Sequence, residues 1–430
     1  MRDRAREIFE HALSECSIPR AFSRHVLYEH GELRLGNDLY ALGSFERTIV
    51  VSIGKAGHTM AEALVNTVGS GLMGVVACPN APPAQLFGFR YFLGGHPLPN
   101  ENSLRAGDSI LRLLSMPSPE TLVVYLISGG ASAIAEKPIS AAISLADMVE
   151  TYKALVHSGA PISEINAIRK HLSELKGGRV ARAAAPSYQA SVLVSDVPEG
   201  ALDALASGPT MPDTTTTDDC YAIAKRYKLL KNFPSAVRTL FEHKQLAETP
   251  KQSDPAFQRS RYTTVLSNAT VVNAAVERAA LSGFAVEVDN GCDDWNYERA
   301  ADHLLGRLRE LRQGVSRVCL ISGGEVTVKV GTKPGLGGRN QQFALYCAQK
   351  IAGENITVLS AGTDGIDGSS DAAGAVVDGT TVERAGLRGL DTATALATFN
   401  TYPVFDAIGD AIMTGPTGNN VRDLRILMAY

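Results

Sequence analysis

Most strand-like runs in this chain end in glycine followed by a polar or charged residue. The clearest case is the sequence LISGG, which occurs at 126–130 and again at 320–324, each time closing an apolar, β-branched run. Glycine lets a backbone approach a ligand without a Cβ clash, and open α/β sheets bind ligands at the carboxyl ends of their strands. We therefore predict two anion-binding loops, although two buried strands can also end alike by chance. The predicted ligand-binding residues of these loops are Ser128, Gly129, Gly130, Ser132, Ser322, Gly323 and Gly324.

Basic residues stand beside other glycine-rich turns. Lys55 follows Gly54 in SIGKAG, between a strand and a helix, where its ammonium group could meet a phosphate at the helix N-terminus. Arg339 precedes Asn340 in GGRNQQ, and its guanidinium group suits bidentate contact with phosphate or carboxylate. We predict catalytic roles for Lys55 and Arg339, and ligand contacts for Gly54, Asn340 and Lys176. The alternatives are a solvated turn lysine, packing at a helix start for Arg339 and a solvated helix end for Lys176.

Acidic residues follow three of the strands. Asp196 ends SVLVSDV, Asp364 follows ITVLSAGT, and Glu325 comes directly after the second LISGG. Carboxylates at such positions hold a divalent cation or accept a proton, but they also serve as N-caps and in Asx-turns. We predict Asp196 as a base or metal ligand, and Glu325 and Asp364 as further metal ligands. His96 in GGHPLPN receives no catalytic role, because a lone histidine is more often a structural hydrogen-bonding residue.

Several classes of protein are excluded by what the sequence lacks. SIGKAG does not fit the P-loop pattern, and the chain has no GxSxG, HExxH or CxxC motif, which argues against serine hydrolysis and zinc sites. A net charge of −4 argues against nucleic-acid binding. The six scattered cysteines, the absence of a long apolar stretch and an N-terminus unlike a signal peptide predict a cytoplasmic protein outside the membrane. Anion loops, cations and acids together favour phosphoryl transfer.

The elements that must position these residues form two groups. A chain of 430 residues favours two domains, for which we predict 1–248 and 260–430, with the polar segment ETPKQSDPAFQRS at the boundary. Alternating strand and helix patterns in the first half predict a Rossmann-like, parallel α/β/α sandwich. The second half predicts a smaller α/β domain, in which EVTVKV forms a hairpin and makes the sheet mixed. The final stretch is expected either within this domain or, as a helix, packed on the first.

In these motifs the chain resembles the glycerate 2-kinases with a MOFRL carboxyl-terminal domain, some of which are labelled hydroxypyruvate reductases. The resemblance implies a two-domain α/β enzyme with its active site in the interdomain cleft. It further implies that ATP and Mg²⁺ are used to phosphorylate the 2-hydroxyl of D-glycerate, and that Lys55 and Arg339 are the cations acting there. The matching stretches are SIGKAGHTMAEAL, GGHPLPNENS, LISGGASA, INAIRKHLSELKGGRVA, SDVPEGALDALASGPTMPD, SGGEVTVKV, GLGGRNQQFAL, SAGTDGIDGSSDAAGAVVD and TGPTGNNVRDL.

The chain departs from the family pattern at some positions, and two rival functions stay open. Glu199 and Gly200 stand where the family often has Gly-Asp, and Ala131 replaces a third glycine. An NAD(P)H-dependent hydroxypyruvate reductase would need a GxGxxG fingerprint, which SIGKAG lacks. A non-catalytic sugar-phosphate-binding protein is the other rival, because VVSIGKAGHTMA also resembles the start of sugar-isomerase domains. A homodimer is left open.

Overall fold

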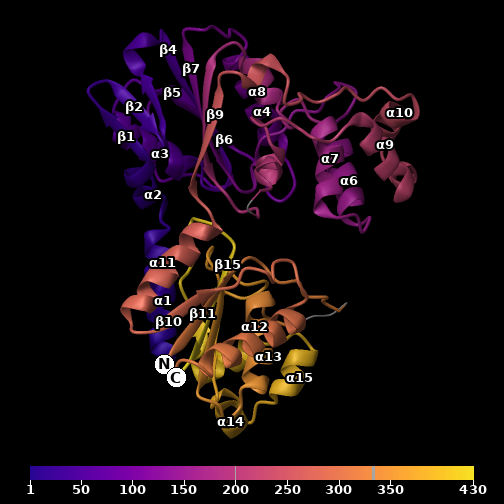
Figure 1. The fold of residues 1–430 in the computed structure, drawn as a ribbon. Helices are drawn as coiled ribbons and strands as arrows, with labels where there is room; N and C mark the ends of the chain where they lie inside the picture. The colour runs from indigo at the N-terminus through magenta and orange to yellow at the C-terminus, as the bar shows by residue number, and fades with distance from the viewer. Residues whose placement is uncertain (199, 332–334) are drawn as a thin grey trace. The chain divides into compact units, whose positions relative to one another are not determined.

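The chain divides into two compact α/β units, shown in Figure 1. The computed structural model describes all residues except 199 and 332–334. Ile18–Val265 form one unit, here named the parallel-sheet unit, while Met1–Ser17 and Leu266–Tyr430 form the other, named the mixed-sheet unit. The predicted α/β class with two units is therefore confirmed. The prediction of an active site in a cleft between the domains concerns their relative placement and stays a prediction.

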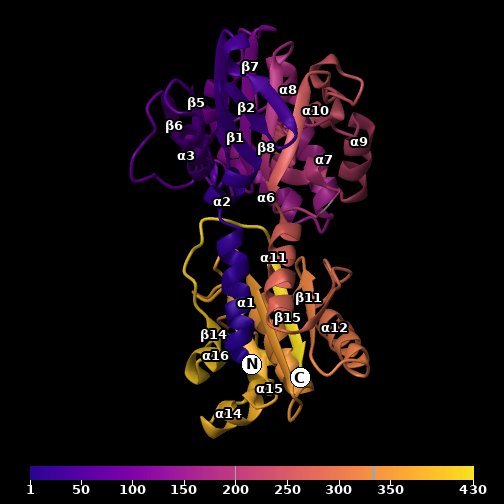
Figure 2. The same cartoon turned by 60° about the vertical axis from the view of Figure 1, so that its left-hand side comes forward.

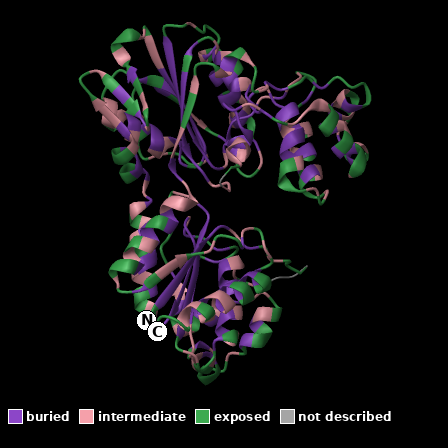
Figure 3. Cartoon of the chain, viewed as in Figure 1, coloured by how far each residue is buried: buried purple, intermediate pink, exposed green. Residues whose placement is uncertain are grey.

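The parallel-sheet unit is built on six strands in the order β6-β5-β4-β7-β8-β9. The β4–β5, β4–β7, β5–β6 and β7–β8 pairs are parallel. Every residue of β7 is buried, which matches the continuous apolar run expected of a parallel strand covered on both faces (Figure 3). The strands are β4 (Arg47–Ile53), β5 (Met73–Cys78), β6 (Phe89–Leu93), β7 (Thr121–Ser128), β8 (Tyr188–Val194) and β9 (Ser260–Leu266).

Helices and a small antiparallel sheet complete the parallel-sheet unit. Capping boxes begin several helices: the Asn100 side chain accepts from the Ser103 backbone at α4, and Ser144 and Asp147 do the same at α6. Four helices form a lobe with its own hydrophobic core, at the side of the unit in Figure 1. That lobe consists of α6 (Leu145–Val156), α7 (Ile162–His171), α9 (Thr217–Arg226) and α10 (Ser235–Glu242). The other elements are α2 (Ile18–His25), β1 (Val26–Glu29), β2 (Glu32–Leu35), β3 (Asp38–Ala41), α3 (Gly57–Val68), α4 (Glu101–Leu113), α5 (Ala131–Ile134) and α8 (Arg179–Ala184).

The mixed-sheet unit also has a six-stranded sheet, in the order β10-β11-β15-β12-β13-β14. Only β10 and β11 pair in parallel, and the other pairs are antiparallel. The strands are β10 (Ala285–Val288), β11 (Val318–Gly323), β12 (Ile356–Gly362), β13 (Gly374–Asp378), β14 (Ala411–Ile412) and β15 (Asp423–Ala429). The helices are α1 (Arg2–Glu15), α11 (Asn268–Leu281), α12 (Tyr297–Arg312), α13 (Arg339–Lys350), α14 (Thr381–Leu387), α15 (Thr392–Ala397) and α16 (Tyr402–Ile408).

Two predictions about this sheet are wrong in detail. The chain ends in a strand and not a helix, because β15 pairs with both β11 and β12 in the middle of the sheet. The predicted EVTVKV hairpin is absent from the described residues, where Thr327 makes only an isolated parallel bridge with Asn296. The sheet is mixed because a carboxyl-terminal strand is inserted between two earlier ones. Strict alternation at 325–330 therefore reflects a segment that lies along a pocket, described below.

The structure draws the domain boundaries elsewhere than at 248 and 260. Residues 255–265 stay with the parallel sheet, which β9 extends next to β8. The first helix, α1, belongs to the mixed-sheet unit and lies along α11, as Figure 2 shows. Its Ile8 and Phe9 side chains are buried, Arg2 pairs with Asp410, and Glu7 pairs with Arg278 of α11. Local sequence patterns predicted this helix but not its distant partner.

The six cysteines lie in the protein interior. All six cysteines are free and buried, as expected of reduced core residues. In the part of the chain that the structure describes, there is no helix that is long and apolar enough to cross a membrane.

Candidate active site

The turn that carries Lys55 is fixed by the first LISGG segment. The Lys55 N–H donates to the Gly129 carbonyl at 2.9 Å, and the Ala56 N–H donates to Ser128 Oγ at 3.1 Å. Gly54 has φ of +130°, and a Cβ there would lie 2.6 Å from the Ser128 carbonyl oxygen. The two loops therefore interlock through backbone atoms, while the Lys55 side chain stays exposed. Ser128 is itself 2% exposed, so its hydroxyl supports this turn.

Three strand ends bring polar side chains to the Gly129–Gly130 pair. A Cβ on Gly129 would lie 2.0 Å from Asp196 Oδ2, which follows β8. A Cβ on Gly130 would lie 2.9 Å from His96 Cδ2, which follows β6, and 3.2 Å from Lys55 Cγ. Small residues are therefore required at both positions, because polar groups occupy the space that a side chain would take. Lys55, His96 and Asp196 surround one loop at the carboxyl edge of the sheet.

His96 is the residue of this group that the sequence alone did not single out. His96 is an exposed residue, but its ring is partly covered by protein. This partial burial, and after it the positive charge of Lys55, lowers the pKa of the imidazole from its ordinary value. A neutral imidazole beside a lysine can accept a hydrogen bond or a proton. The GGHPLPN motif contained the signal, but only the fold places it beside SIGKAG.

Ser132 begins a second polar group next to the same loop. Its hydroxyl lies 3.0 Å from the Ser207 hydroxyl, which donates to Asn166 Oδ1 at 3.4 Å. Ala206 and Ser207 have φ of +55° and +59°, a conformation that is strained for residues other than glycine. The Ser207 carbonyl accepts from the Gly177 N–H at 3.0 Å, so the GGR turn helps to hold that strain. The predicted ligand contact of Ser132 stays a prediction.

The structure revises the prediction for Lys176. Its side chain is buried and pairs with Glu136, while its Nζ donates to the Tyr152 hydroxyl at 3.0 Å. Burial lowers the pKa of this lysine, and Glu136 opposes that change. Glu136 and Tyr152 are also buried. The Lys176 ammonium group is therefore paired within the protein interior and is not accessible to a ligand.

In the mixed-sheet unit, Arg339 is held by two carboxylates. It starts α13, and its Nε and Nη2 donate to the two oxygens of Asp423 at 2.6 and 3.0 Å. Its Nη2 also pairs with Glu325 at 2.7 Å. Burial opposes the charge, but the contacts with Asp423 and Glu325 raise the pKa of the guanidinium group overall. Among the described residues, no hydrogen bond or ion pair uses Nη1, which leaves this nitrogen for a ligand.

The carboxylates around Arg339 crowd one another. Burial and then the charge of Asp423 raise the pKa of Glu325. Burial raises the pKa of Asp367 to about 7, although this side chain accepts the Asn340 N–H at 3.1 Å and the Gln341 N–H at 2.8 Å. Asp367 therefore caps α13. Asn340, predicted to contact a ligand, is 1% exposed and instead accepts a hydrogen bond from an interior serine, so that prediction is revised.

The second LISGG loop does not repeat the first. Its N–H groups donate to side chains: Gly323 to Asn290 at 2.8 Å, Gly324 to Asn268 at 2.9 Å, and Glu325 to Asp293 at 3.0 Å. Ser322 is fully buried. The predicted backbone anion site at Ser322, Gly323 and Gly324 is therefore already satisfied by the protein. At the first loop, by contrast, none of the hydrogen bonds found within the described residues uses the N–H of Gly130.

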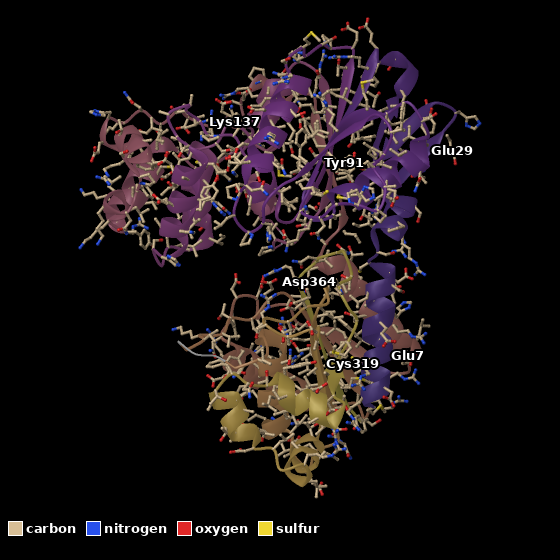
Figure 4. The ribbon with its side chains drawn as sticks, turned by 180° about the vertical axis from the view of Figure 1, so that it is seen from behind. Glu7, Glu29, Tyr91, Lys137, Cys319 and Asp364 are labelled. Carbon is tan, nitrogen blue, oxygen red and sulfur yellow. The ribbon has the colours of Figure 1, made fainter. Side chains whose placement is uncertain are left out.

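A pocket of about 730 Å³ lies within the mixed-sheet unit. This volume is typical of small-molecule sites. Asp364, labelled in Figure 4 near one end of the unit's sheet, lines the pocket together with Glu325 and Arg339. Four lining carboxyl groups and one guanidinium group make it acidic. The apolar part of the wall comes from Val326, Val328, Val330, Ile366 and Phe399.

The predicted metal ligands belong to different units. Asp196 is in the parallel-sheet unit, whereas Glu325 and Asp364 are in the mixed-sheet unit. The described residues contain no group of three or more acidic, histidine or cysteine side chains arranged to hold a metal ion. Mg²⁺ usually needs only one or two carboxylates when substrate phosphates supply the other oxygens. A metal role for Glu325 and Asp364 stays a prediction. Glu199, at the position that departs from the family pattern, lies outside the described residues.

A parallel sheet whose strand ends gather a lysine, a histidine and an aspartate, joined to a second unit with an acidic pocket, defines a two-unit α/β protein with a candidate site in each unit. Family models match this chain at 4–242, described as a domain of unknown function (DUF4147), and at 318–423, described as the MOFRL family. The sequence is 34% identical to D-glycerate 2-kinase of Thermotoga maritima, over 89% of this chain and 91% of that one. It is also 34% identical to a putative hydroxypyruvate reductase of Agrobacterium vitis, over 89% and 87%.

The solved structures agree with the sequence relatives. A crystal structure of glycerate kinase from Thermotoga maritima has a TM-score of 0.87 and 31% identity, covering 100% of this chain and 99% of that one. A protein from Pyrococcus horikoshii gives a TM-score of 0.84 at 30% identity, covering 100% and 98%. The chain belongs to the glycerate 2-kinase family.

Proposed function

We propose that this protein is a glycerate 2-kinase that transfers the γ-phosphoryl group of ATP to the 2-hydroxyl of D-glycerate. The observation that carries the proposal is the convergence of Lys55, His96 and Asp196 on the Gly129–Gly130 loop. Relatives named as D-glycerate 2-kinase and glycerate kinase support it.

Lys55 supplies positive charge where an anion would bind. Its backbone is anchored by the Gly129 carbonyl, but its ammonium group is exposed. A carboxylate or phosphoryl group near this lysine gains a charge-assisted contact, and charge that develops on the transferred group is stabilised without reorganisation of the turn. We propose that D-glycerate binds at this edge of the parallel sheet, with the hydroxyl of Ser132 near it.

We propose that ATP binds in the pocket of the mixed-sheet unit. The apolar wall suits a purine base, and the Arg339 Nη1 suits a phosphate oxygen. A triphosphate would be repelled by the acidic wall unless a cation came with it. Glu325 and Asp364 would hold Mg²⁺ together with the phosphates, and a bound Mg²⁺ supplies charge neutralisation of the phosphoryl oxygens.

A kinetic comparison of lysine variants tests the role of this strand edge. Lys55→Met should lower kcat/KM by at least about 10²-fold, because it removes a cation from the reacting region. Lys153→Met changes an exposed lysine of α6 and should leave the rate unchanged. Equal activity of the two variants would contradict the proposal. Oxidation of NADPH by hydroxypyruvate, without ADP formation from glycerate and ATP, would instead support a reductase.

A further inference from the structure

We propose that His96 is a catalytic residue, which accepts the proton of the substrate 2-hydroxyl. This inference rests on the proposed kinase function. Neither the lysine nor the arginine of the site can serve as that acceptor, because both are cations at neutral pH. The proton can go to His96, to Asp196, to water or to an oxygen of the transferred phosphoryl group, and only the first two belong to this strand edge.

The position of His96 is fixed by the segment around it. Gly95 N–H donates to Ser103 Oγ at 3.0 Å, and the Asn100 side chain accepts from the Ser103 N–H at 2.9 Å. The Asn100 amide also donates to the Leu93 carbonyl at 3.2 Å, which closes the loop between β6 and α4. These hydrogen bonds hold the backbone on both sides of His96. The ring lies over Gly130, within 3.2 Å of the point where a side chain would begin.

The neighbours of His96 and the chemistry of Asp196 favour His96 as the base. Lys55 Cγ lies beside the same Gly130 position, and partial burial followed by the positive charge of Lys55 lowers the pKa of His96, which favours the neutral imidazole. Asp196 faces Gly129 on the other side of the loop. A carboxylate is ordinarily a weaker base than an imidazole, and a general base works best when its pKa lies near the operating pH.

The 2-hydroxyl oxygen forms a bond to the γ-phosphorus of ATP while the bond from that phosphorus to the β,γ-bridging oxygen breaks, and its electron pair leaves with ADP. The hydroxyl proton moves to a ring nitrogen of His96. The imidazolium that results lies beside Lys55, so it returns its proton readily to solvent.

Steady-state kinetics across pH test this role. His96→Gln should lower kcat by roughly 10²-fold with both KM values within about threefold, and should abolish the loss of kcat/KM on the acidic side of the profile. His157→Gln alters an exposed histidine of the helical lobe and serves as the matched control. His96→Ala should regain at least about tenfold of its activity on addition of imidazole. A His96→Gln enzyme with kcat within about threefold and the same acidic limb would overturn the proposal.

A second readout separates this inference from the proposed function. In wild-type protein labelled with ¹³C-histidine, the His96 resonance should titrate below pH 6.5, and Lys55→Met should raise that midpoint. An unchanged midpoint would overturn the argument from Lys55 whatever the enzyme does. If wild-type protein makes no phosphoglycerate, the proposed function fails and the role of His96 fails with it. If wild-type protein is active and His96→Gln is equally active, only the role of His96 fails.

Discussion

Gly54 offers the sharpest test of how the Lys55 turn is built. An alanine there must adopt φ near +130°, and its Cβ would lie 2.2 Å from Ser128 Oγ and 2.6 Å from the Ser128 carbonyl oxygen. The serine hydroxyl could rotate, but the carbonyl belongs to the central strand β7 and cannot. The unfavourable backbone conformation costs about 1–3 kcal/mol, and the clash adds about 1–3 kcal/mol. Gly54→Ala should therefore lower the free energy of unfolding by about 2–6 kcal/mol.

Gly69 provides the matched control, because it isolates the backbone contribution from the clash. It lies at the end of α3 with φ of +93°, and a Cβ there would meet nothing within 4 Å. Gly69→Ala should cost only the backbone contribution of about 1–3 kcal/mol and leave kcat/KM unchanged. Gly54→Ala, by contrast, should also lower kcat/KM by about 10²-fold at a temperature where it is folded, since the turn that carries Lys55 must shift.

Urea denaturation followed by circular dichroism measures the first effect, and steady-state assays of the folded variants measure the second. The two alanine variants should differ in their unfolding midpoints with similar slopes. If Gly54→Ala and Gly69→Ala were equally stable and equally active, the interlocked loops would not position Lys55, and the reasoning would be refuted.

Three further predictions concern buried charges and the pocket. Lys176→Met should lower the free energy of unfolding in urea by about 3–5 kcal/mol, because it leaves Glu136 buried and unpaired. The KM values of the folded variant should not change. A raised KM with normal stability would show that Lys176 contacts a ligand. In the folded protein, burial raises the pKa of Asp367 from 3.8 to about 7, so stability should fall as pH rises through this window, by at most about 4 kcal/mol. Asp367→Asn should flatten that dependence in melts between pH 4 and 8, and an unchanged slope would count against it. Val328→Trp, which fills the pocket, should raise the KM for ATP by about tenfold and leave the KM for D-glycerate within about twofold, whereas the reverse pattern would move ATP out of the pocket.

Local sequence patterns predicted the features that depend on short, continuous runs of the chain. Short continuous runs of sequence predict the β4–Lys55–α3 junction, the apolar β7 before Gly129 and the helix that starts at Arg339. Such features depend on hydrophobic periodicity and on glycine, which a sequence displays directly. The family resemblance indicated that motifs far apart in the chain belong to one active site.

What the sequence could not predict depends on contacts between distant segments. The two LISGG stretches are identical in sequence but differ in their hydrogen bonds. Asn268 and Asn290 accept from the N–H groups of the second loop, and no side chain does so among the hydrogen bonds found at the first loop. Lys176 resembled a basic helix end until Glu136, forty residues earlier in the chain, was placed beside it. Asp423, in the last strand, forms an ion pair with Arg339. Asp423 stood in the quoted motif GNNVRDL, but nothing local marked it as the partner of an arginine.

The central claim is the identity of the reaction, and phosphorus NMR tests it most directly. The purified protein would be mixed with D-glycerate, ATP and Mg²⁺, and the ³¹P spectrum followed with authentic 2- and 3-phosphoglycerate as standards. The account predicts a growing 2-phosphoglycerate resonance matched by ADP, which Lys55→Met suppresses and Lys153→Met does not. A 3-phosphoglycerate product, or no phosphorylated glycerate from an enzyme that consumes NADPH with hydroxypyruvate, would contradict it.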